Sequence, residues 1–160
     1  MKRVAAIALG SNLESRYGDR TANLQEAVEQ IGKLGVVQAL STFHDTEPVG
    51  YVSQPRFLNA ALVLETELEP LELMRGLLAI EHGMGRERVI VKGPRVIDLD
   101  LLLYEQVVMS TSELTLPHPE MHLRRFVLDP LAEIAPGMTH PVLGLTVAEM
   151  LRAIPTPHKG

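Results

Sequence analysis

The order of short apolar strands and amphipathic helices is the feature that most constrains the fold of this chain. Apolar runs without polar alternation indicate buried strands, whereas apolar residues at intervals of three and four indicate helices. The order along the chain is β-α-β-β-α-β, followed by one more strand and short helices. The expected strands are 4–9, 36–43, 57–65, 96–103 and 106–109, and the expected helices are 19–33, 70–83 and 147–154.

This order predicts an α+β fold with a ferredoxin-like βαββαβ core, in which two helices pack on one face of an antiparallel sheet. The strand over 106–109 is expected to pair with 96–103 through a tight hairpin, and helices follow toward the C-terminus. Residues 44–56 and 85–94 carry the proline and glycine typical of long loops.

The composition excludes several classes of protein. The absence of cysteine excludes a disulfide scaffold, a zinc-thiolate site and a thiol nucleophile. A net charge of -5 and a pI of about 5.7 argue against a nucleic-acid binder. No apolar run has the length of a membrane helix, so we expect a cytoplasmic protein with no membrane partner. With 160 residues, a single domain over 1–160 is expected, with a loose tail at 155–160.

Two aspartates interrupt the apolar strand expected over 96–103. Successive side chains of a strand point to opposite faces, so Asp98 and Asp100 share one face, roughly 7 Å apart. Ile97 and Leu99 share the other face and can enter the core. Two neighbouring carboxylates repel each other, and a hard cation such as Mg²⁺ is their natural partner. The alternative is a solvated polar face with Arg95 as the ion-pair partner.

Arginines precede this aspartate pair. Arg86, Arg88 and Arg95 lie on the expected loop and at the start of the strand. Guanidinium groups bind phosphate bidentately, and phosphate clamps beside metal ligands are what a nucleoside-triphosphate site requires. The chain has no G-x-x-x-x-G-K-[ST] segment, so it is not a P-loop enzyme. An ordinary exposed, charged loop is the alternative.

Two further segments carry polar residues in constrained positions. His118 stands between Pro117 and Pro119, which stiffen the backbone around it, so its ring could donate to a phosphate or ribose oxygen. Asn59 lies inside an apolar strand, where a buried amide needs partners such as the edge of a flat heterocycle. Phe57 shares the face of Asn59 and could contact such a ring. The alternatives are a structural histidine and an asparagine that satisfies nearby backbone.

Taken together, these segments resemble one family, 6-hydroxymethyl-7,8-dihydropterin pyrophosphokinase, an enzyme of folate biosynthesis. The most specific segment is Gly93-Pro94-Arg95-x-x-Asp98-Leu99-Asp100. The resemblance covers nearly the whole chain in the right order. It also runs through Ala5 to Leu13, Leu116-Pro117-His118-Pro119, Arg125 to Leu131 and Ile134-Ala135-Pro136.

The resemblance implies the transfer of pyrophosphate from ATP to the hydroxymethyl group of the pterin, with release of AMP. It implies two Mg²⁺ ions held by Asp98 and Asp100, and it assigns Arg86 and Arg95 to the ATP phosphates. ATP and the pterin are the only partners implied, and a monomer is expected, with a weak dimer as the alternative. The implied ATP site comprises Glu81, Arg88, Leu101, Thr115, His118 and Arg124. The implied pterin site comprises Thr46, Pro48, Val49, Phe57, Asn59 and Phe126.

The chain departs from the family pattern before Gly93. Family members carry a tryptophan directly before Gly-Pro-Arg and a basic residue before that, whereas this chain has Lys92 and Val91 and no tryptophan. The resemblance therefore predicts altered loop closure, pterin affinity or turnover. The metal ligands and Arg95 are unchanged.

Three rival interpretations remain. A relative that binds pterin or ATP without transferring phosphate would form no AMP. A metal-dependent nuclease or nucleotidyltransferase could use the aspartate pair, but the acidic pI and the lack of a basic aromatic surface count against it. A purely structural ferredoxin-like module would leave the aspartate pair unexplained.

Overall fold

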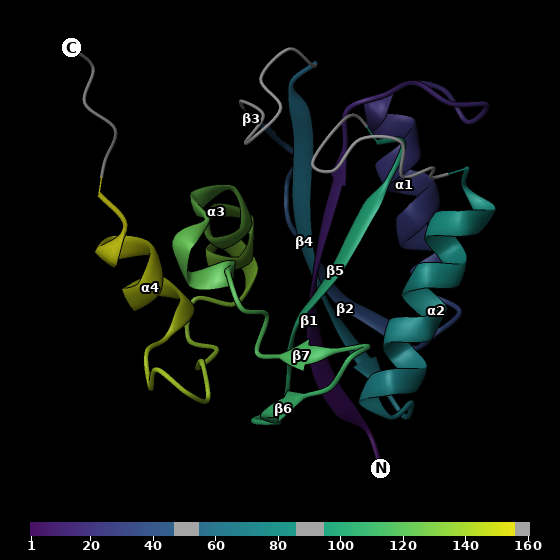
Figure 1. Cartoon of the computed structure of the whole chain (residues 1–160). Coiled ribbons are helices and arrows are strands. Elements are labelled where there is room, and N and C mark those ends of the chain that lie inside the picture. Colours follow the sequence, from purple (N-terminus) through teal and green to yellow (C-terminus); the bar gives the residue numbers. More distant parts are fainter. Residues whose placement is uncertain (47–54, 86–94, 156–160) are drawn as a thin grey trace.

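A computed structural model of the chain describes residues 1–46, 55–85 and 95–155 (Figure 1). Its elements follow the expected order. They are β1 (Arg3–Ser11), α1 (Arg20–Ile31), β2 (Val36–Leu40), β3 (His44–Thr46), β4 (Phe57–Thr66), α2 (Pro70–Gly83), β5 (Asp98–Tyr104), β6 (Met109–Ser110), β7 (Thr115–Leu116), a 3-10 turn η1 (Met121–Leu123), α3 (Arg125–Ile134) and α4 (Val147–Ala153).

The main sheet is antiparallel and has the strand order β2-β4-β1-β5, with β3 pairing to β4. Its central strands β1 and β4 are apolar along most of their length because both of their faces are covered. The predicted ferredoxin-like fold is confirmed.

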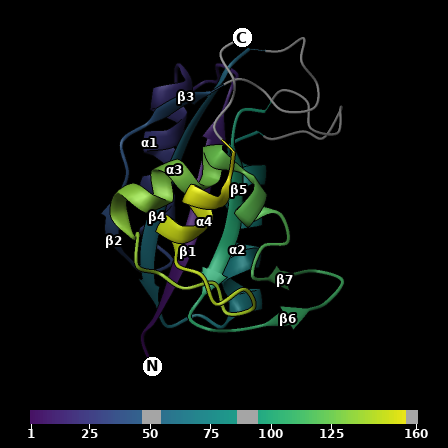
Figure 2. The ribbon, with the colours of Figure 1, turned by 90° about the vertical axis from the view of Figure 1, so that its left-hand side faces the viewer.

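The two faces of the sheet carry different helices (Figures 1 and 2). Helices α1 and α2 pack on one face, where Ile7, Leu62 and Leu77 belong to one buried cluster. Helices α3 and α4 cover the other face, where the small residues Ala6 and Ala61 lie in a second cluster. The sheet is therefore the middle of three layers.

Local signals begin the helices where the sequence places them. Asp19 caps α1 by accepting a hydrogen bond from the Ala22 backbone N–H at 3.0 Å. Pro70 occupies the first turn of α2, where its missing N–H has no helical partner to lose. Thr146 and Glu149 form the predicted capping box of α4.

Two expectations about strands were wrong. β6 pairs with β7 and not with β5, because the backbone turns away at Glu105, which adopts a left-handed φ of 49°. The expected loop over 44–56 contains β3, whose pairing with β4 is a tertiary contact that local composition does not encode. None of the helices within 1–46, 55–85 and 95–155 combines the length and apolar character needed to cross a bilayer.

His140 provides a test of how this fold responds to pH. Its buried Nδ1 accepts hydrogen bonds from the backbone N–H groups of Val142 and Leu143, at 3.3 Å and 3.0 Å. Burial, and secondly the charge of His122, lower the pKa of His140 below its usual 6.5. The unfolded chain therefore takes up this proton first as the pH falls, and stability is lost from about pH 6.5 down through the folded pKa.

We expect His140→Asn to make the free energy of unfolding depend less on pH between 7 and 5. The asparagine oxygen retains an acceptor for the two N–H groups but does not titrate. Urea unfolding at pH 7, 6 and 5 measures the slope of the free energy of unfolding against pH in both proteins. Equal slopes would show that His140 does not couple folding to protonation.

Candidate active site

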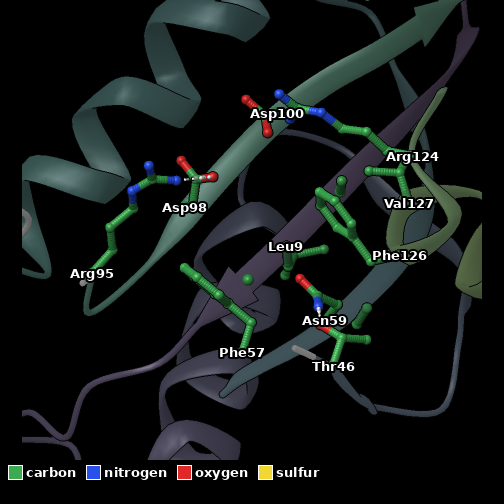
Figure 3. A pocket seen from close by; sticks show the side chains of 13 residues that line it. Leu9, Thr46, Phe57, Asn59, Arg95, Asp98, Asp100, Arg124, Phe126 and Val127 are labelled. Carbon is green, nitrogen blue, oxygen red and sulfur yellow. Dashed lines mark hydrogen bonds and ion pairs between the residues drawn. The ribbon is translucent and has the colours of Figure 1, made fainter. Parts of the chain in front are cut away.

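A pocket opens where β1, β4 and β5 meet α3 (Figure 3). Small residues of β1 form the floor of this pocket. Gly10 pairs with Asn59 of β4 on one side and with Asp98 of β5 on the other. Ala8 pairs with Asp100 of β5. Two strand spacings separate the amide from the carboxylates, about 10 Å. The pocket is lined by Ala8, Leu9, Gly10, Thr46, Phe57, Asn59, Ala60, Arg95, Asp98, Asp100, Arg124, Phe126 and Val127.

The two aspartates share the face of β5 that the sequence predicts. Asp98 and Asp100 point into the pocket, whereas Ile97 and Leu99 are buried on the opposite face at 0% and 6% exposure. Burial, and then the negative charges of Asp98 and Glu81, raise the pKa of Asp100 to about 7. The site thus concentrates negative charge that an added cation would relieve.

Arg95 and Arg124 bring positive charge to the two aspartates. Arg95 Nη1 donates to Asp98 Oδ2 at 3.0 Å, and its guanidinium lies 6.0 Å from the centre of the Phe57 ring. Arg124 pairs with Glu120 and reaches toward Asp100 (Figure 3). The ion pair that the alternative interpretation gave to Arg95 therefore exists in this structure, with Asp98 as the partner.

The opposite end of the pocket is aromatic and amide-bearing. Asn59 lies on β4, is 7% exposed, and donates from Nδ2 to the hydroxyl of Thr46. Phe57 and Phe126 flank it from β4 and α3. The hydrogen bond from Asn59 to Thr46 fixes the orientation of the amide, so its oxygen and second N–H are set for a partner in the pocket. This corner suits a flat ring with donor and acceptor groups on one edge.

A second cavity adjoins the first at the aspartates. Asp98 and Asp100 line both cavities, and Glu81, Leu101, Thr115 and His118 line only the second. Two cavities therefore share the same pair of carboxylates. Such sharing is what a reaction between two bound molecules needs.

Glu81 and His118 are held firmly in the second cavity. Glu81 is 2% exposed and accepts the Leu99 backbone N–H at 2.7 Å. His118 Nδ1 accepts the Glu120 backbone N–H at 3.2 Å. Burial, and then the charge of Arg124, lower the pKa of His118. The neutral ring accepts at Nδ1, so it carries its proton on Nε2 as a hydrogen-bond donor.

The donor set fits a magnesium site. Mg²⁺ takes one or two carboxylates and completes its shell with waters and phosphate oxygens. Within the described ranges, no group of three or more histidine, cysteine, aspartate or glutamate side chains is placed to hold an ion. Two carboxylates beside an open cavity therefore suit an ion that shares its ligands with a substrate.

The chain matches a sequence model described as 7,8-dihydro-6-hydroxymethylpterin-pyrophosphokinase (HPPK) over residues 6–136. The chain belongs to this family. It is 43% identical over 136 residues to the 2-amino-4-hydroxy-6-hydroxymethyldihydropteridine pyrophosphokinase of Bacillus subtilis, covering 84% of this chain and 79% of that protein. The protein of that name from Methylorubrum extorquens is 45% identical over 149 residues, covering 92% and 90%.

Other relatives are much longer. The folic acid synthesis protein fol1 of Schizosaccharomyces pombe is 38% identical over 156 residues, which are 96% of this chain but 21% of that protein. The crystal structure of wild-type Plasmodium falciparum HPPK-DHPS superposes with a TM-score of 0.74 at 14% identity, covering 95% of this chain and 44% of that one. The likeness to the Plasmodium falciparum structure shows that the present chain has the same fold as the matched part of that protein.

The structure brings most of the residues that the family resemblance implies to the two cavities. The first cavity holds Thr46, Phe57, Asn59, Arg95, Asp98, Asp100, Arg124 and Phe126. The second holds Glu81, Leu101, Thr115 and His118. The remaining predicted site residues, Pro48, Val49, Arg86 and Arg88, lie outside the described residues, as do Val91 and Lys92.

The role of Asn12 was not predicted, because the first strand was expected to end at residue 9, before Gly10-Ser11-Asn12. In the structure β1 continues to Ser11, and Asn12 is buried at 2% exposure. Its Oδ1 accepts the Arg95 backbone N–H at 2.7 Å, and its Nδ2 donates to the Pro55 carbonyl at 3.0 Å. Asn12 thus joins the start of the aspartate-bearing strand to the segment that leads into β4.

Proposed function

We propose that the chain transfers pyrophosphate from ATP to the hydroxymethyl group of 6-hydroxymethyl-7,8-dihydropterin, giving AMP and the pterin diphosphate. The observation that carries this proposal is the pair Asp98 and Asp100, which lines an aromatic, amide-bearing pocket and a second cavity at once. The hydroxymethyl oxygen forms a bond to the β-phosphorus of ATP and loses its proton to water. The bond from that phosphorus to the oxygen of the α-phosphate breaks, and AMP leaves.

The pterin belongs in the corner formed by Thr46, Phe57, Asn59 and Phe126, which we call the pterin corner. The amide of Asn59 matches the donor and acceptor edge of the pterin, because Thr46 already fixes its orientation. The two aromatic side chains enclose the flat ring and exclude water. With the ring in this corner, its hydroxymethyl group reaches toward the aspartates across the pocket floor.

ATP belongs in the second cavity. The Nε2–H of His118 is available to a phosphate or ribose oxygen, and Arg95 and Arg124 can pair with phosphate oxygens at the junction of the cavities. Leu101 and Thr115 supply apolar and hydroxyl surface to the nucleotide. Positive charge placed before the reaction stabilises the charge that develops on the transferring phosphates.

Two Mg²⁺ ions would be held by Asp98 and Asp100, where they would neutralise phosphate charge and align the two reacting oxygens. Arg95 pairs with Asp98 in this structure, and it would be free to pair with the phosphates if cations occupied that carboxylate. The cytoplasmic location and monomeric state expected from the sequence stay predictions.

The nucleotide product tests this function. The protein is mixed with ATP, Mg²⁺ and 6-hydroxymethyl-7,8-dihydropterin, beside a variant carrying Asp98→Ala and Asp100→Ala. AMP formed only with pterin, and lost in the variant, supports pyrophosphate transfer through the aspartate pair. ADP as the product would contradict the reaction type. Absence of turnover with pterin or ATP binding intact would instead support the non-catalytic relative.

We expect Gly10→Ala to raise the KM for the pterin by about tenfold, the equivalent of about 1.4 kcal/mol. A Cβ at position 10 would lie 3.0 Å from Asn59 Oδ1 and 3.7 Å from Phe57 Cδ1, so the amide must move. Steady-state kinetics with pterin varied at saturating ATP measures this change. Gly137→Ala is the control, because nothing lies within 4 Å of its Cβ. An unchanged KM would show that the pterin does not use the Asn59 amide.

A further inference from the structure

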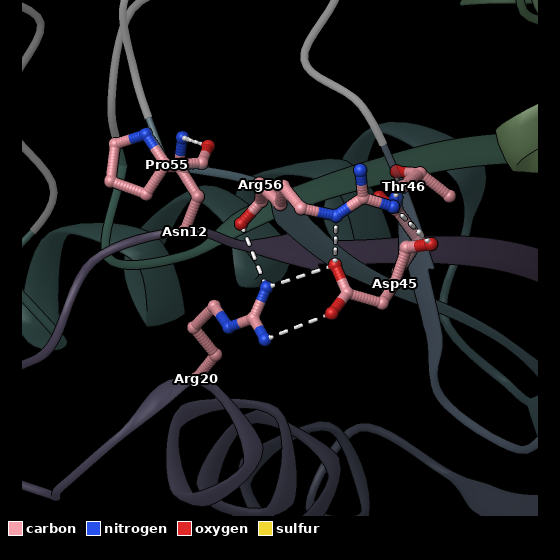
Figure 4. A network of polar contacts seen from close by, with 7 residues as sticks. Asn12, Arg20, Asp45, Thr46, Pro55 and Arg56 are labelled. Carbon is pink, nitrogen blue, oxygen red and sulfur yellow. Dashed lines mark hydrogen bonds and ion pairs between the residues drawn. The ribbon is translucent and has the colours of Figure 1, made fainter.

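Asp45 on β3 is the centre of an ionic network next to Thr46 (Figure 4). Arg20, at the start of α1, donates from its two terminal nitrogens to the two carboxylate oxygens of Asp45, each at 3.3 Å. Arg56 donates from Nε to the same carboxylate at 3.0 Å and from Nη2 to the Asp45 carbonyl at 3.3 Å. Arg20 also donates to the Arg56 carbonyl at 2.8 Å. The three side chains therefore join α1, β3 and the residue before β4.

The network is directly adjacent in the chain to residues of the pterin corner. Asp45 precedes Thr46, and Arg56 precedes Phe57, and these two corner residues pair with each other across β3 and β4. Thr46 in turn accepts the hydrogen bond that orients Asn59. The position of Asp45 therefore fixes where the Thr46 hydroxyl lies.

β3 needs such support because it is very short. It has three residues, and within the described ranges its only strand partner is β4. A strand of this length gains little from its own ladder. Its first residue, His44, contacts Glu133 of α3 at 2.9 Å. Its second residue, Asp45, is bound to α1 through Arg20. Side chains on the two sides of β3 thus hold it between helices from different layers.

From these contacts we propose that Arg20, Asp45 and Arg56 are positioning residues for the pterin. They hold Thr46, and through it the Asn59 amide, in the orientation that receives the ring. The proposal rests on the proposed function, because the pterin is the ligand assigned to that corner. It adds a specificity element that touches neither substrate.

The exposure of the network separates this role from a general stabilising role. The side chains of Arg20 and Asp45 are 31% and 49% exposed, and ion pairs this exposed contribute little to global stability. The two arginines lower the pKa of Asp45, so its carboxylate is charged at neutral pH. The network therefore acts on the local position of β3 more than on the free energy of unfolding.

The test compares Arg20→Met with a matched ion pair elsewhere. Arg3 and Glu69 also lie 3.3 Å apart, and Arg3 is 32% exposed, but neither residue lines either of the two cavities of the candidate site. Steady-state kinetics is measured for the parent, Arg20→Met, Arg20→Lys and Arg3→Met, with pterin and ATP varied in turn. Thermal unfolding of all four proteins reports on the fold.

We expect Arg20→Met to raise the KM for the pterin about tenfold, with kcat and the KM for ATP within about twofold of the parent. Arg20→Lys recovers part of the loss, because an ammonium reaches one carboxylate oxygen but cannot bind both. Arg3→Met leaves both KM values unchanged, and its Tm shift equals that of Arg20→Met. Asp45→Asn is expected to change the KM for the pterin, kcat and the KM for ATP as Arg20→Met does.

Two outcomes would overturn the positioning role. In one, Arg20→Met and Arg3→Met have the same KM for the pterin. In the other, kcat and both KM values change together in Arg20→Met, as they would if the whole site were loosened. If the parent forms no AMP, the proposed function fails separately. The pterin dissociation constant, measured by calorimetry with a non-hydrolysable ATP analogue, then decides the positioning role, and equal constants in the parent and Arg20→Met overturn it.

Discussion

We expect replacement of Asp98 or Asp100, the proposed metal ligands, with asparagine to lower the rate of AMP formation by at least about a thousandfold, because charge stabilisation is lost with the ligand. Asparagine keeps the shape of each side chain but removes its charge, and both carboxylates line the junction of the two cavities. The measurement is single-turnover AMP formation with saturating ATP, pterin and Mg²⁺. Retention of more than about a tenth of the parent rate in both variants would contradict the assignment, since ligand loss costs much more than that.

The same variants separate chemistry from folding. Burial, and then the charges of Asp98 and Glu81, destabilise the charged carboxylate of Asp100, so Asp100→Asn removes a buried charge and relieves like-charge repulsion. We therefore expect its Tm to be higher than that of the parent at pH 8 without divalent cations. Asp129→Asn is the matched control for activity, because Asp129 lies on α3 outside both cavities and pairs with Arg125 at 3.7 Å. It retains the parent rate.

Gly35→Ala lowers the free energy of unfolding by about 3–4 kcal/mol, at or above the upper end of the range for overpacking, because the neighbour is rigid backbone. Gly35 lies just before β2, and a Cβ on it would stand 2.2 Å from the carbonyl oxygen of Glu65 on β4. Val36 pairs with Glu65 at this point, so relief of the clash must disrupt the start of the β2–β4 ladder. Urea or thermal unfolding measures the loss.

Gly83→Ala provides the comparison for this prediction. Gly83 is the last residue of α2, and nothing lies within 4 Å of its added Cβ. Alanine has a higher helix propensity than glycine, so the free energy of unfolding of this variant rises by up to about 1 kcal/mol. Equal stability of the two alanine variants would mean that Gly35 does not contact β4 as closely as the structure shows.

Residues that interact within a few positions of one another were predicted well. The alternation of Asp98 and Asp100 with Ile97 and Leu99 follows from strand geometry alone, and the structure confirms it. The capping box of α4 follows from Thr146 and its i+3 neighbour in the same way. In both cases the prediction depends only on side chains that lie one helical turn or one strand pleat apart.

Contacts between distant segments were not predicted. β6 leaves the main sheet and pairs with β7, and β3 forms where a loop was expected. Asn12 bonds to Arg95 and to Pro55, far along the chain from it. Neither local periodicity nor turn composition predicts these contacts. The contacts depend on which surfaces remain to be covered once the sheet has assembled.

Three features follow from the amino-acid pattern alone: the order of elements, the face on which the two carboxylates lie, and the family resemblance that the comparisons support. The packing of the folded chain, in contrast, completed the site. It set Gly10 between Asn59 and Asp98, placed α3 over the second face of the sheet, and tied Asp45 to α1 through Arg20. The reason is physical. Patterning reports which side of an element is buried, whereas the strand register and the helix packing set which distant residues meet there.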